Sequence, residues 1–370
     1  MAKNLTKLSN LDTTDFTTAL AQYRAHIDTA ITEYVQELES HTSEQFGGYP
    51  LEAVKAFTDV LSRGGKRIRG SLAIAAYEMF GGTNTKMITA AASALEILNT
   101  YILIADDIQD RSHSRRGGKT AHIILKEYHE QNYLSGDAQH FGESIAINAF
   151  LIAQHYAMNI LANLDAPAEL KIRAIDNVNR CFIATAHGQT LDIFNEVVAC
   201  VGQEDVNNVL EWKTAYYTFI NPLQLGAILA GANESDLTEL AEYGLYAGRA
   251  FQIADDVIGV FGDESVSGKS SMDDIREGKR TTLSVYAISN APKADAMFLN
   301  QCLGKQNLTM AEFKQCKQIL VDSGALAYAK QQAHESAEAA EKVIVKNTNW
   351  PKRSQQFLQD LVQYIAERKA

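Results

Sequence analysis

Two clusters of aspartates are the residues of this 370-residue chain whose type and spacing could do chemistry. The first is Asp106-Asp107-Ile108-Gln109-Asp110, and the second is Asp255-Asp256. Asp106 and Asp110 stand four residues apart, so a helix would project both from one face. Carboxylates held this close repel each other unless a cation lies between them, and oxygen ligands without nearby His or Cys suit Mg²⁺. We interpret the first cluster as a magnesium site; the alternative is a solvated helix end.

Basic residues occur on both sides of the first cluster. Arg115-Arg116-Gly117-Gly118 places two guanidinium groups on a glycine turn, where they can bind phosphate oxygens in pairs. The run Gly64-Gly65-Lys66-Arg67-Ile68-Arg69-Gly70 places three cations at an expected helix start, where backbone N–H groups also favour an anion. Either run alone is more often solvated surface. Together with two aspartate clusters they favour a site for magnesium and phosphate.

The segment from Gly262 to Gly278 follows the second cluster and is rich in Gly, Ser and charged residues. It is longer than an ordinary connection, which suggests a functional loop. Lys269 and Lys279 could fold over a phosphate and exclude water. The alternative is a surface loop with ordinary charges.

Helices are expected to position these residues. The spacing of apolar side chains favours helices almost throughout, no segment is a convincing strand, and no linker divides the chain, so we expect one domain over residues 1–370. The predicted helices cover roughly residues 15–40, 50–62, 67–80, 86–110, 120–132, 142–164, 168–195, 204–231, 236–261, 281–290, 311–323 and 325–346.

Composition excludes several classes of protein. An apolar content of 46% can fill a core, which excludes a disordered chain, and a net charge of −11 disfavours general attraction to nucleic acid or anionic lipid. The four cysteines form no CxxC pair. The first residues contain no continuous apolar run, and Glu96 and Asn99 interrupt the most apolar stretch, residues 87–105. We therefore expect a cytoplasmic protein without a membrane span.

Six motifs in order make the chain resemble the trans-isoprenyl diphosphate synthases of the polyprenyl synthetase family. The resemblance covers roughly residues 50–285, and six ordered motifs are far more specific than any one. The motifs are GGKRIRG (64–70), DDIQD (106–110) with RRG (115–117), GQTLD (188–192), KTAYYTF (213–219), FQIADDVIG (251–259) and GK with DDIREGK (268–279).

The resemblance implies an all-α fold, a helical bundle around a deep central cavity, with the two aspartate motifs facing each other across the mouth of the cavity. It also implies that the protein is usually a homodimer. It implies a magnesium-dependent prenyltransferase that condenses isopentenyl diphosphate with an allylic diphosphate. The allylic substrate would be dimethylallyl, geranyl or farnesyl diphosphate. The alternatives are a silent subunit of a heteromeric synthase and a related magnesium enzyme that cyclises diphosphates or condenses them head to head.

Residue roles also follow from the resemblance. Asp106 and Asp110 would bind two Mg²⁺ ions and Asp255 a third. Water-mediated contacts would fall to Asp107, Asp256 and Asp274. The allylic diphosphate would bind Arg115, Lys213, Lys269 and Lys279. Isopentenyl diphosphate would bind Lys66, Arg69, Asn99 and Arg116. Thr214 and Gln252 would line the reaction centre, and the GQTLD motif places Gln189 and Asp192 in the cavity or in helix packing.

Three positions depart from the family pattern. Gly259 stands where many members have a third aspartate in the second motif. Asn99 stands where relatives carry His or Gln, and its shorter amide can still bind a phosphate. Asn148-Ala149 stands where many members have Gly-Asp.

Tyr101 and Ile102 are the candidates for setting product length. The rise of a helix places them roughly 6–8 Å below Asp106, where a growing chain must pass. Ile102 shares the face of Asp106, whereas Tyr101 lies round the side, so its role as a floor rests on the resemblance. The resemblance implies that one aromatic residue at this level gives geranylgeranyl diphosphate as the product, with farnesyl or a longer diphosphate as the alternative. Leu98 or Leu95 could close the cavity instead.

Overall fold

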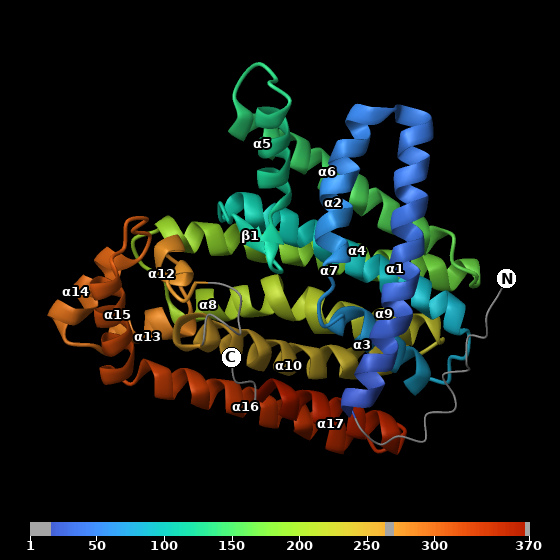
Figure 1. Cartoon of the computed structure of the whole chain (residues 1–370). Coiled ribbons are helices and arrows are strands. Elements are labelled where there is room, and N and C mark those ends of the chain that lie inside the picture. Colours follow the sequence, from blue (N-terminus) through green and yellow to red (C-terminus); the bar gives the residue numbers. More distant parts are fainter. Residues whose placement is uncertain (1–15, 263–269, 367–370) are drawn as a thin grey trace. The chain divides into compact units, whose positions relative to one another are not determined.

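The structure, a computed structural model, describes residues 16–262 and 270–366 and confirms the predicted all-α fold (Figure 1). The elements are α1 (Phe16–Phe46), α2 (Gly48–Ser62), α3 (Ile68–Met79), α4 (Thr85–Gln109), β1 (Ser114–Arg115), β2 (Gly118–Lys119), α5 (Ala121–Gln131), α6 (Ala138–Ala162), α7 (Ala168–Val197), α8 (Gln203–Val209), η2 (Leu210–Ile220), α9 (Asn221–Leu229), α10 (Glu234–Phe261), α12 (Asp273–Glu277), α13 (Thr282–Asn290), α14 (Lys293–Cys302), α15 (Met310–Asp322), α16 (Ala325–Lys346) and α17 (Lys352–Ala366).

The chain divides into two compact units. Unit 1 comprises Met1–Ile175 and Leu225–Gly231, and unit 2 comprises Asp176–Gln224 and Ala232–Ala370. The first aspartate motif and the basic run before it lie in unit 1, and the second aspartate motif lies in unit 2. The single domain expected over the whole chain stays a prediction.

Helix α4 is the central element of unit 1. It begins where the side chain of Asn84 accepts a hydrogen bond of 3.0 Å from the backbone N–H of Met87, which satisfies a free donor of the first turn. Its residues from Met87 to Thr100 are almost all buried, and α3 and α6 pack against it. This burial explains why the helix can carry the acidic motif at its C-terminal end, where acidic residues oppose the helix dipole.

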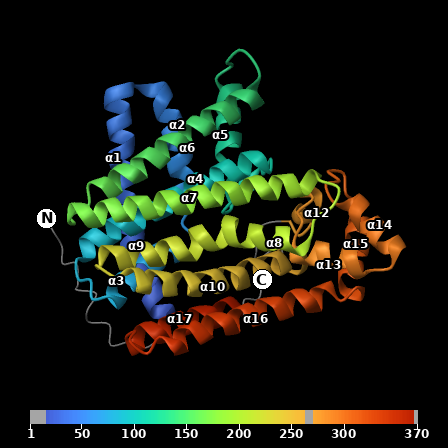
Figure 2. The ribbon, with the colours of Figure 1, turned by 180° about the vertical axis from the view of Figure 1, so that it is seen from behind.

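Helix α10 is the central element of unit 2. A capping box between Asn233 and Asp236 starts it, as each side chain accepts a hydrogen bond from the other residue's backbone N–H. Helices η2 and α16 pack along it, and α16 lies beside α10 in both views (Figures 1 and 2). The buried Tyr243 ring crosses this core, and its hydroxyl donates to the Leu358 carbonyl oxygen over 2.9 Å.

The structure differs from the predicted elements at five places. Helices α12, α14 and α17 lie outside the predicted helices, and α12 lies within the segment expected as a loop. Residues 204–231 were predicted as one helix, but their middle part, η2, is a π-helix, whose wider turns apolar spacing does not distinguish from α-turns. A two-residue antiparallel ribbon, β1 with β2, follows α4. Arg116 and Gly117 turn it with φ of 53° and 72°, the positive values that a tight hairpin turn requires.

Two helices, α4 and α6, are long and apolar enough to cross a membrane by length and composition alone. The apolar stretch of α4 is mostly buried inside the protein, as expected for a core helix, whereas only 33% of that of α6 is buried. The apolar character of α4 is therefore accounted for by the protein's own interior.

Gly188 allows helix α7 to approach η2 within unit 2. A Cβ atom at this position would lie 2.3 Å from the backbone nitrogen of Lys213 and 2.7 Å from the carbonyl carbon of Trp212. Any side chain here would push apart the backbones of two helices, and it would move Lys213, a predicted substrate-binding residue.

We therefore expect Gly188→Ala to lower the free energy of unfolding by about 1–3 kcal/mol, because overpacking against backbone atoms outweighs the helix propensity that alanine adds. Urea unfolding followed by circular dichroism measures the change. Gly48→Ala is the matched control, since a Cβ at Gly48 would meet nothing within 4 Å. Equal stability of the Gly188→Ala and Gly48→Ala variants would contradict the close approach.

Candidate active site

The first candidate group lies at the C-terminal end of α4. Asp106 and Asp110 are partly exposed, whereas the Asp107 side chain is fully buried. Asp110 caps the helix, and its backbone N–H donates to the Asp106 carbonyl oxygen over 2.8 Å. The motif therefore presents one carboxylate to the interior and two towards the surface of unit 1.

Arg115 binds the buried carboxylate. Its Nε donates to Asp107 Oδ1 over 2.8 Å, and its Nη2 lies 2.5 Å from the same oxygen and 3.2 Å from Asp106 Oδ2. Burial alone would lower the pKa of Arg115, but the charges of Asp107, Asp106 and Asp110 outweigh it and raise the pKa above its ordinary value. The guanidinium group stays charged and fixes the relative position of Asp106 and Asp107.

The β1–β2 ribbon brings Arg115 back to the end of α4. Arg63, at the end of α2, holds the ribbon by donating from Nη1 to the carbonyl oxygens of Arg115 over 3.0 Å and Lys119 over 2.7 Å. A Cβ at Gly118 would lie 2.4 Å from the Arg63 guanidinium carbon, so a side chain there would displace the guanidinium group that holds the ribbon. Arg63 is not among the predicted site residues. Its place directly before the GGKRIRG run is the one sequence signal that could have suggested it.

The three cations of the GGKRIRG run have different surroundings. Arg67 is buried, and its Nε donates to Asp28 over 2.8 Å while its Nη1 lies 3.6 Å from the buried carboxylate of Glu96. Lys66 is exposed in the loop before α3, and Arg69 is partly buried in the first turn of α3. Arg67 thus has a structural role, which leaves Lys66 and Arg69 as the ligand-binding candidates that the sequence predicted.

Arg116 lies close to these cations. Burial, together with the charges of Arg67 and Arg69, lowers the pKa of Arg116 to about 10. A Cβ at Gly65 would lie 3.4 Å from Arg116 Nη2, so the glycine loop runs directly past the guanidinium group. Cations held this close in a partly buried place are typical of an anion-binding site.

Three predicted site residues lie on α4 within the two turns before Asp106: Asn99, Tyr101 and Ile102. Asn99 is buried, and in the described part of the chain its side-chain oxygen accepts no hydrogen bond, which fits a residue that contacts a ligand. Tyr101 and Ile102 are partly buried. The Tyr101 ring meets the Phe150 ring of α6 edge to face, with centroids 5.3 Å apart.

The second candidate group lies in unit 2 on α7, η2 and α10. Lys213 Nζ forms an ion pair with Asp192 Oδ2 over 2.5 Å. Thr214 donates to Gln252 Oε1 over 2.9 Å, and Gln252 Nε2 donates to Asp256 Oδ1 over 2.8 Å. The structure thereby connects residues from the KTAYYTF and FQIADDVIG motifs.

Carboxylates gather round the end of α10. Burial raises the pKa of Asp256, and the charges of Asp274 and Asp255 raise it further, although the hydrogen bond from Gln252 opposes the shift. Lys279 forms an ion pair of 2.7 Å with Glu277. The predicted ligand Lys269 lies outside the described residues.

Magnesium fits both groups by the chemistry of their donors. In residues 16–262 and 270–366, no three Asp, Glu, His or Cys side chains converge to hold a metal ion by themselves. Mg²⁺ characteristically takes only one or two protein carboxylates and completes its shell with water and substrate phosphate. Asp106 and Asp110, four residues apart on α4, offer such a pair, Asp255 of α10 offers a single carboxylate, and the negative charge around Asp256 suits a cation.

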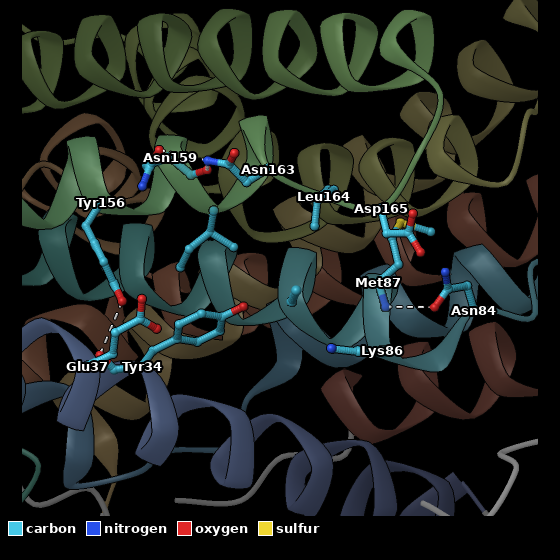
Figure 3. Close-up of a pocket in the computed structure, with 12 residues that line it drawn as sticks. Tyr34, Glu37, Asn84, Lys86, Met87, Tyr156, Asn159, Asn163, Leu164 and Asp165 are labelled. Carbon is cyan, nitrogen blue, oxygen red and sulfur yellow. Dashed lines mark hydrogen bonds between the residues drawn. The ribbon is translucent and has the colours of Figure 1, made fainter.

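A pocket of about 420 Å³ lies elsewhere in unit 1, between α1, α4 and α6 (Figure 3). The rings of Tyr34 and Tyr156 meet edge to face on its wall, with centroids 6.2 Å apart. Glu37, Lys86 and Asp165 are exposed charged residues of its lining. None of the predicted site residues is among those that line it. This pocket therefore takes no part in the two candidate groups.

Comparisons with known proteins identify the family of the chain. The sequence model of the polyprenyl synthetases matches residues 52–320. The chain belongs to the polyprenyl synthetase family. The geranylfarnesyl diphosphate synthase of Aeropyrum pernix is 31% identical over 340 residues, 91% of this chain and 99% of that protein. The geranylgeranyl pyrophosphate synthase of Geoglobus acetivorans is 31% identical over 319 residues, 86% and 92% of the two chains.

A solved structure extends the similarity to the fold. The geranylgeranyl pyrophosphate synthase of Corynebacterium glutamicum, crystallised with isoprenyl diphosphate and magnesium, is 31% identical, with a TM-score of 0.89. The alignment covers 95% of this chain and 99% of that one. The isoprenoid synthase fold and the membership of a family of prenyl diphosphate synthases, both predicted from the motifs, are confirmed.

The buried Asp107–Arg115 pair gives a stability prediction. Arg115→Ala would leave the Asp107 carboxylate buried without its cation, so we expect unfolding free energy to fall by about 3–5 kcal/mol. Denaturant unfolding measures it. Arg180→Ala is the control, because it removes an exposed ion pair with Asp176 and should cost about 0–1 kcal/mol. A loss no larger than that of Arg180→Ala would show that the pair does not organise the motif.

Proposed function

We propose that the protein is a chain-elongating prenyltransferase that joins isopentenyl diphosphate to an allylic diphosphate, with geranylgeranyl diphosphate as the main product. One observation carries the proposal: Arg115 holds the carboxylates at the end of α4, while Arg116 and Arg69 form a second cationic group in the same unit. The carboxylates at the end of α4 suit a diphosphate that is bound through metal ions. The group of Arg116 and Arg69 suits a diphosphate that is bound by cationic side chains alone.

The candidate residues take the following roles in this proposal. Asp106 and Asp110 bind two Mg²⁺ ions and Asp255 binds a third. The allylic diphosphate contacts Arg115, Lys213, Lys269 and Lys279. Isopentenyl diphosphate contacts Lys66, Arg69, Arg116 and Asn99. Thr214 and Gln252 line the reaction centre, held together by the hydrogen bond between them.

Bond cleavage in this reaction needs a stabilised leaving group. When bound, magnesium supplies positive charge that stabilises the departing diphosphate. Arg115 and Lys213 add fixed positive charges, which cost little reorganisation because Asp107 and Asp192 already hold them in place. Apolar side chains exclude water from the reacting carbon. The alkene of isopentenyl diphosphate attacks the allylic carbon as the diphosphate leaves. The released diphosphate accepts the final proton, so no histidine base is required.

The proposed assembly is a homodimer of a soluble cytoplasmic enzyme. The exposed apolar side chains of α6 support it, since Ile147 and Leu151 are each 42% exposed and Ile152 is 37% exposed. Polar residues such as Glu143 and Asn148 are interspersed along the same helix. An apolar face rimmed by polar residues suits a second copy of this chain better than lipid.

The deciding experiment incubates the protein with radiolabelled isopentenyl diphosphate and each allylic primer, with and without Mg²⁺, and separates the products by chromatography. We expect elongation only with Mg²⁺, and we expect Asp106→Ala to reduce turnover by several orders of magnitude because it removes a charged metal ligand. Asp176→Ala, which removes an exposed surface carboxylate, is the control.

The alternatives give different results. No elongation with any primer in the presence of Mg²⁺ would identify a silent subunit, and cyclic or head-to-head products would identify the related enzymes. Asp106→Ala turnover within a few-fold of the parent, in a folded protein, would refute the metal assignment.

Product length is proposed to depend on Tyr101. Its ring and that of Phe150 lie together in unit 1, below the level of Asp106 on α4. We expect Tyr101→Ala to lengthen the main product, because removal of the ring opens volume for another isoprene unit. Chromatography of the dephosphorylated products measures the length. Tyr133→Ala is the control, since Tyr133 is 94% exposed. An unchanged product distribution would assign the floor to deeper residues such as Leu98.

A further inference from the structure

The pocket between α1, α4 and α6 lies outside both candidate groups, and its lining has the composition of a ligand site (Figure 3). Its volume of about 420 Å³ lies in the range of pockets that hold small molecules. All of its lining residues belong to unit 1. The chemistry of these side chains indicates which class of small molecule would bind.

The inner surface of the pocket is apolar. Met87 of α4, Ile160 of α6 and Leu164, which follows α6, line the pocket and are buried. Ala90, one turn after Met87 on α4, is also part of the lining. Such a surface stabilises the methylene groups of a ligand by removing them from water. The ligand should therefore contain an aliphatic segment.

Two tyrosines and a carboxylate form one end of the pocket. The Tyr156 hydroxyl donates to the Tyr34 carbonyl oxygen over 3.4 Å, and the two rings meet edge to face. Burial raises the pKa of both tyrosine hydroxyls, and the negative charge of Glu37 raises it further. The tyrosines thus stay neutral beside a carboxylate. Aromatic rings next to a carboxylate attract an ammonium group.

A second carboxylate, that of Asp165, lies at the other end of the pocket from Glu37 (Figure 3). Within the part of the chain that the structure describes, neither carboxylate forms an ion pair, and Lys86 of the lining pairs with neither of them. Two carboxylates against one ammonium group leave the lining with a net negative charge, which disfavours an anionic ligand. Each end of the pocket therefore offers a carboxylate to a cation.

A metal ion does not match this arrangement. In residues 16–262 and 270–366 no three Asp, Glu, His or Cys side chains converge on one point, and an apolar surface separates the two carboxylates of this pocket. A metal ion needs oxygen ligands gathered round a single centre. Two separate carboxylates with an apolar surface between them suit an elongated organic cation instead.

We propose that this pocket binds a linear aliphatic diammonium ion. One ammonium group pairs with Glu37 beside the rings of Tyr34 and Tyr156, the other pairs with Asp165, and the methylene chain between them covers the apolar inner surface. The inference goes beyond the proposed function, because the pocket contains none of the residues assigned to magnesium or to the two diphosphates.

The test is isothermal titration calorimetry of the full-length chain with cadaverine, a linear aliphatic diamine, at low ionic strength. We expect saturable binding with a dissociation constant below about 1 mM. Pentylamine has the same carbon chain but a single ammonium group, so it should bind about fivefold more weakly because it forms one exposed ion pair fewer. No allylic substrate is present, so the result does not depend on the proposed function.

Substitutions locate the bound diamine, which could otherwise meet the aspartate motifs. Glu37→Gln and Asp165→Asn should each weaken cadaverine binding about fivefold, since each removes one carboxylate. Lys86→Ala should strengthen it, because it removes a like charge from the lining. Glu44→Gln is the matched control, since it removes the same charge from α1 at a position outside the pocket. Circular dichroism checks that each variant is folded.

Three results would overturn the proposal. The first is a parent protein that shows no saturable binding of cadaverine, or that binds pentylamine equally well. The second is a loss of affinity in Glu37→Gln that is no larger than the loss in Glu44→Gln, which would place the diamine elsewhere on the chain. The third is weaker cadaverine binding by Lys86→Ala, which would contradict the predicted repulsion between Lys86 and the ligand.

Discussion

A fully buried carboxylate needs a cation beside it, and at the end of α4 the pair of Asp107 with Arg115 meets this need. The geometry of the first group depends on this ion pair. The chain must turn back after α4 so that Arg115 reaches Asp107, and Arg63 must hold the ribbon that makes the turn. Asp106 receives a second contact from the same guanidinium group, which fixes its position relative to Asp107.

The second group combines the Lys213–Asp192 ion pair with hydrogen bonds from two neutral side chains, those of Thr214 and Gln252. Thr214, Gln252 and Asp256 form a series of hydrogen bonds that extends from η2 to α10. The amide of Gln252 uses both of its ends, as acceptor and as donor, so its orientation is fixed. Because neutral donors compensate only part of the charge, the carboxylates near Asp256 keep a negative environment into which a cation can bind.

Close approaches made possible by glycine recur in both units. Gly118 leaves room for the Arg63 guanidinium group, Gly188 for the backbone of η2, and Gly259 for the Asp274 carboxylate. In none of the three is the backbone φ positive. Each glycine is therefore explained by a neighbour that occupies the volume of a side chain, and such a neighbour comes from a distant part of the sequence.

The sequence by itself determined the helical fold and the chemistry, because apolar periodicity marks helices and the motifs name the charged residues in order. Periodicity assigns a residue to a face but does not say what lies opposite. Only the tertiary structure decided that Arg67 is buried against Asp28 and Glu96 while Lys66 is exposed, although they are neighbours in one basic run. It alone placed Asp274 against Gly259, since segments separated in sequence meet only through the packing of α12 against α10.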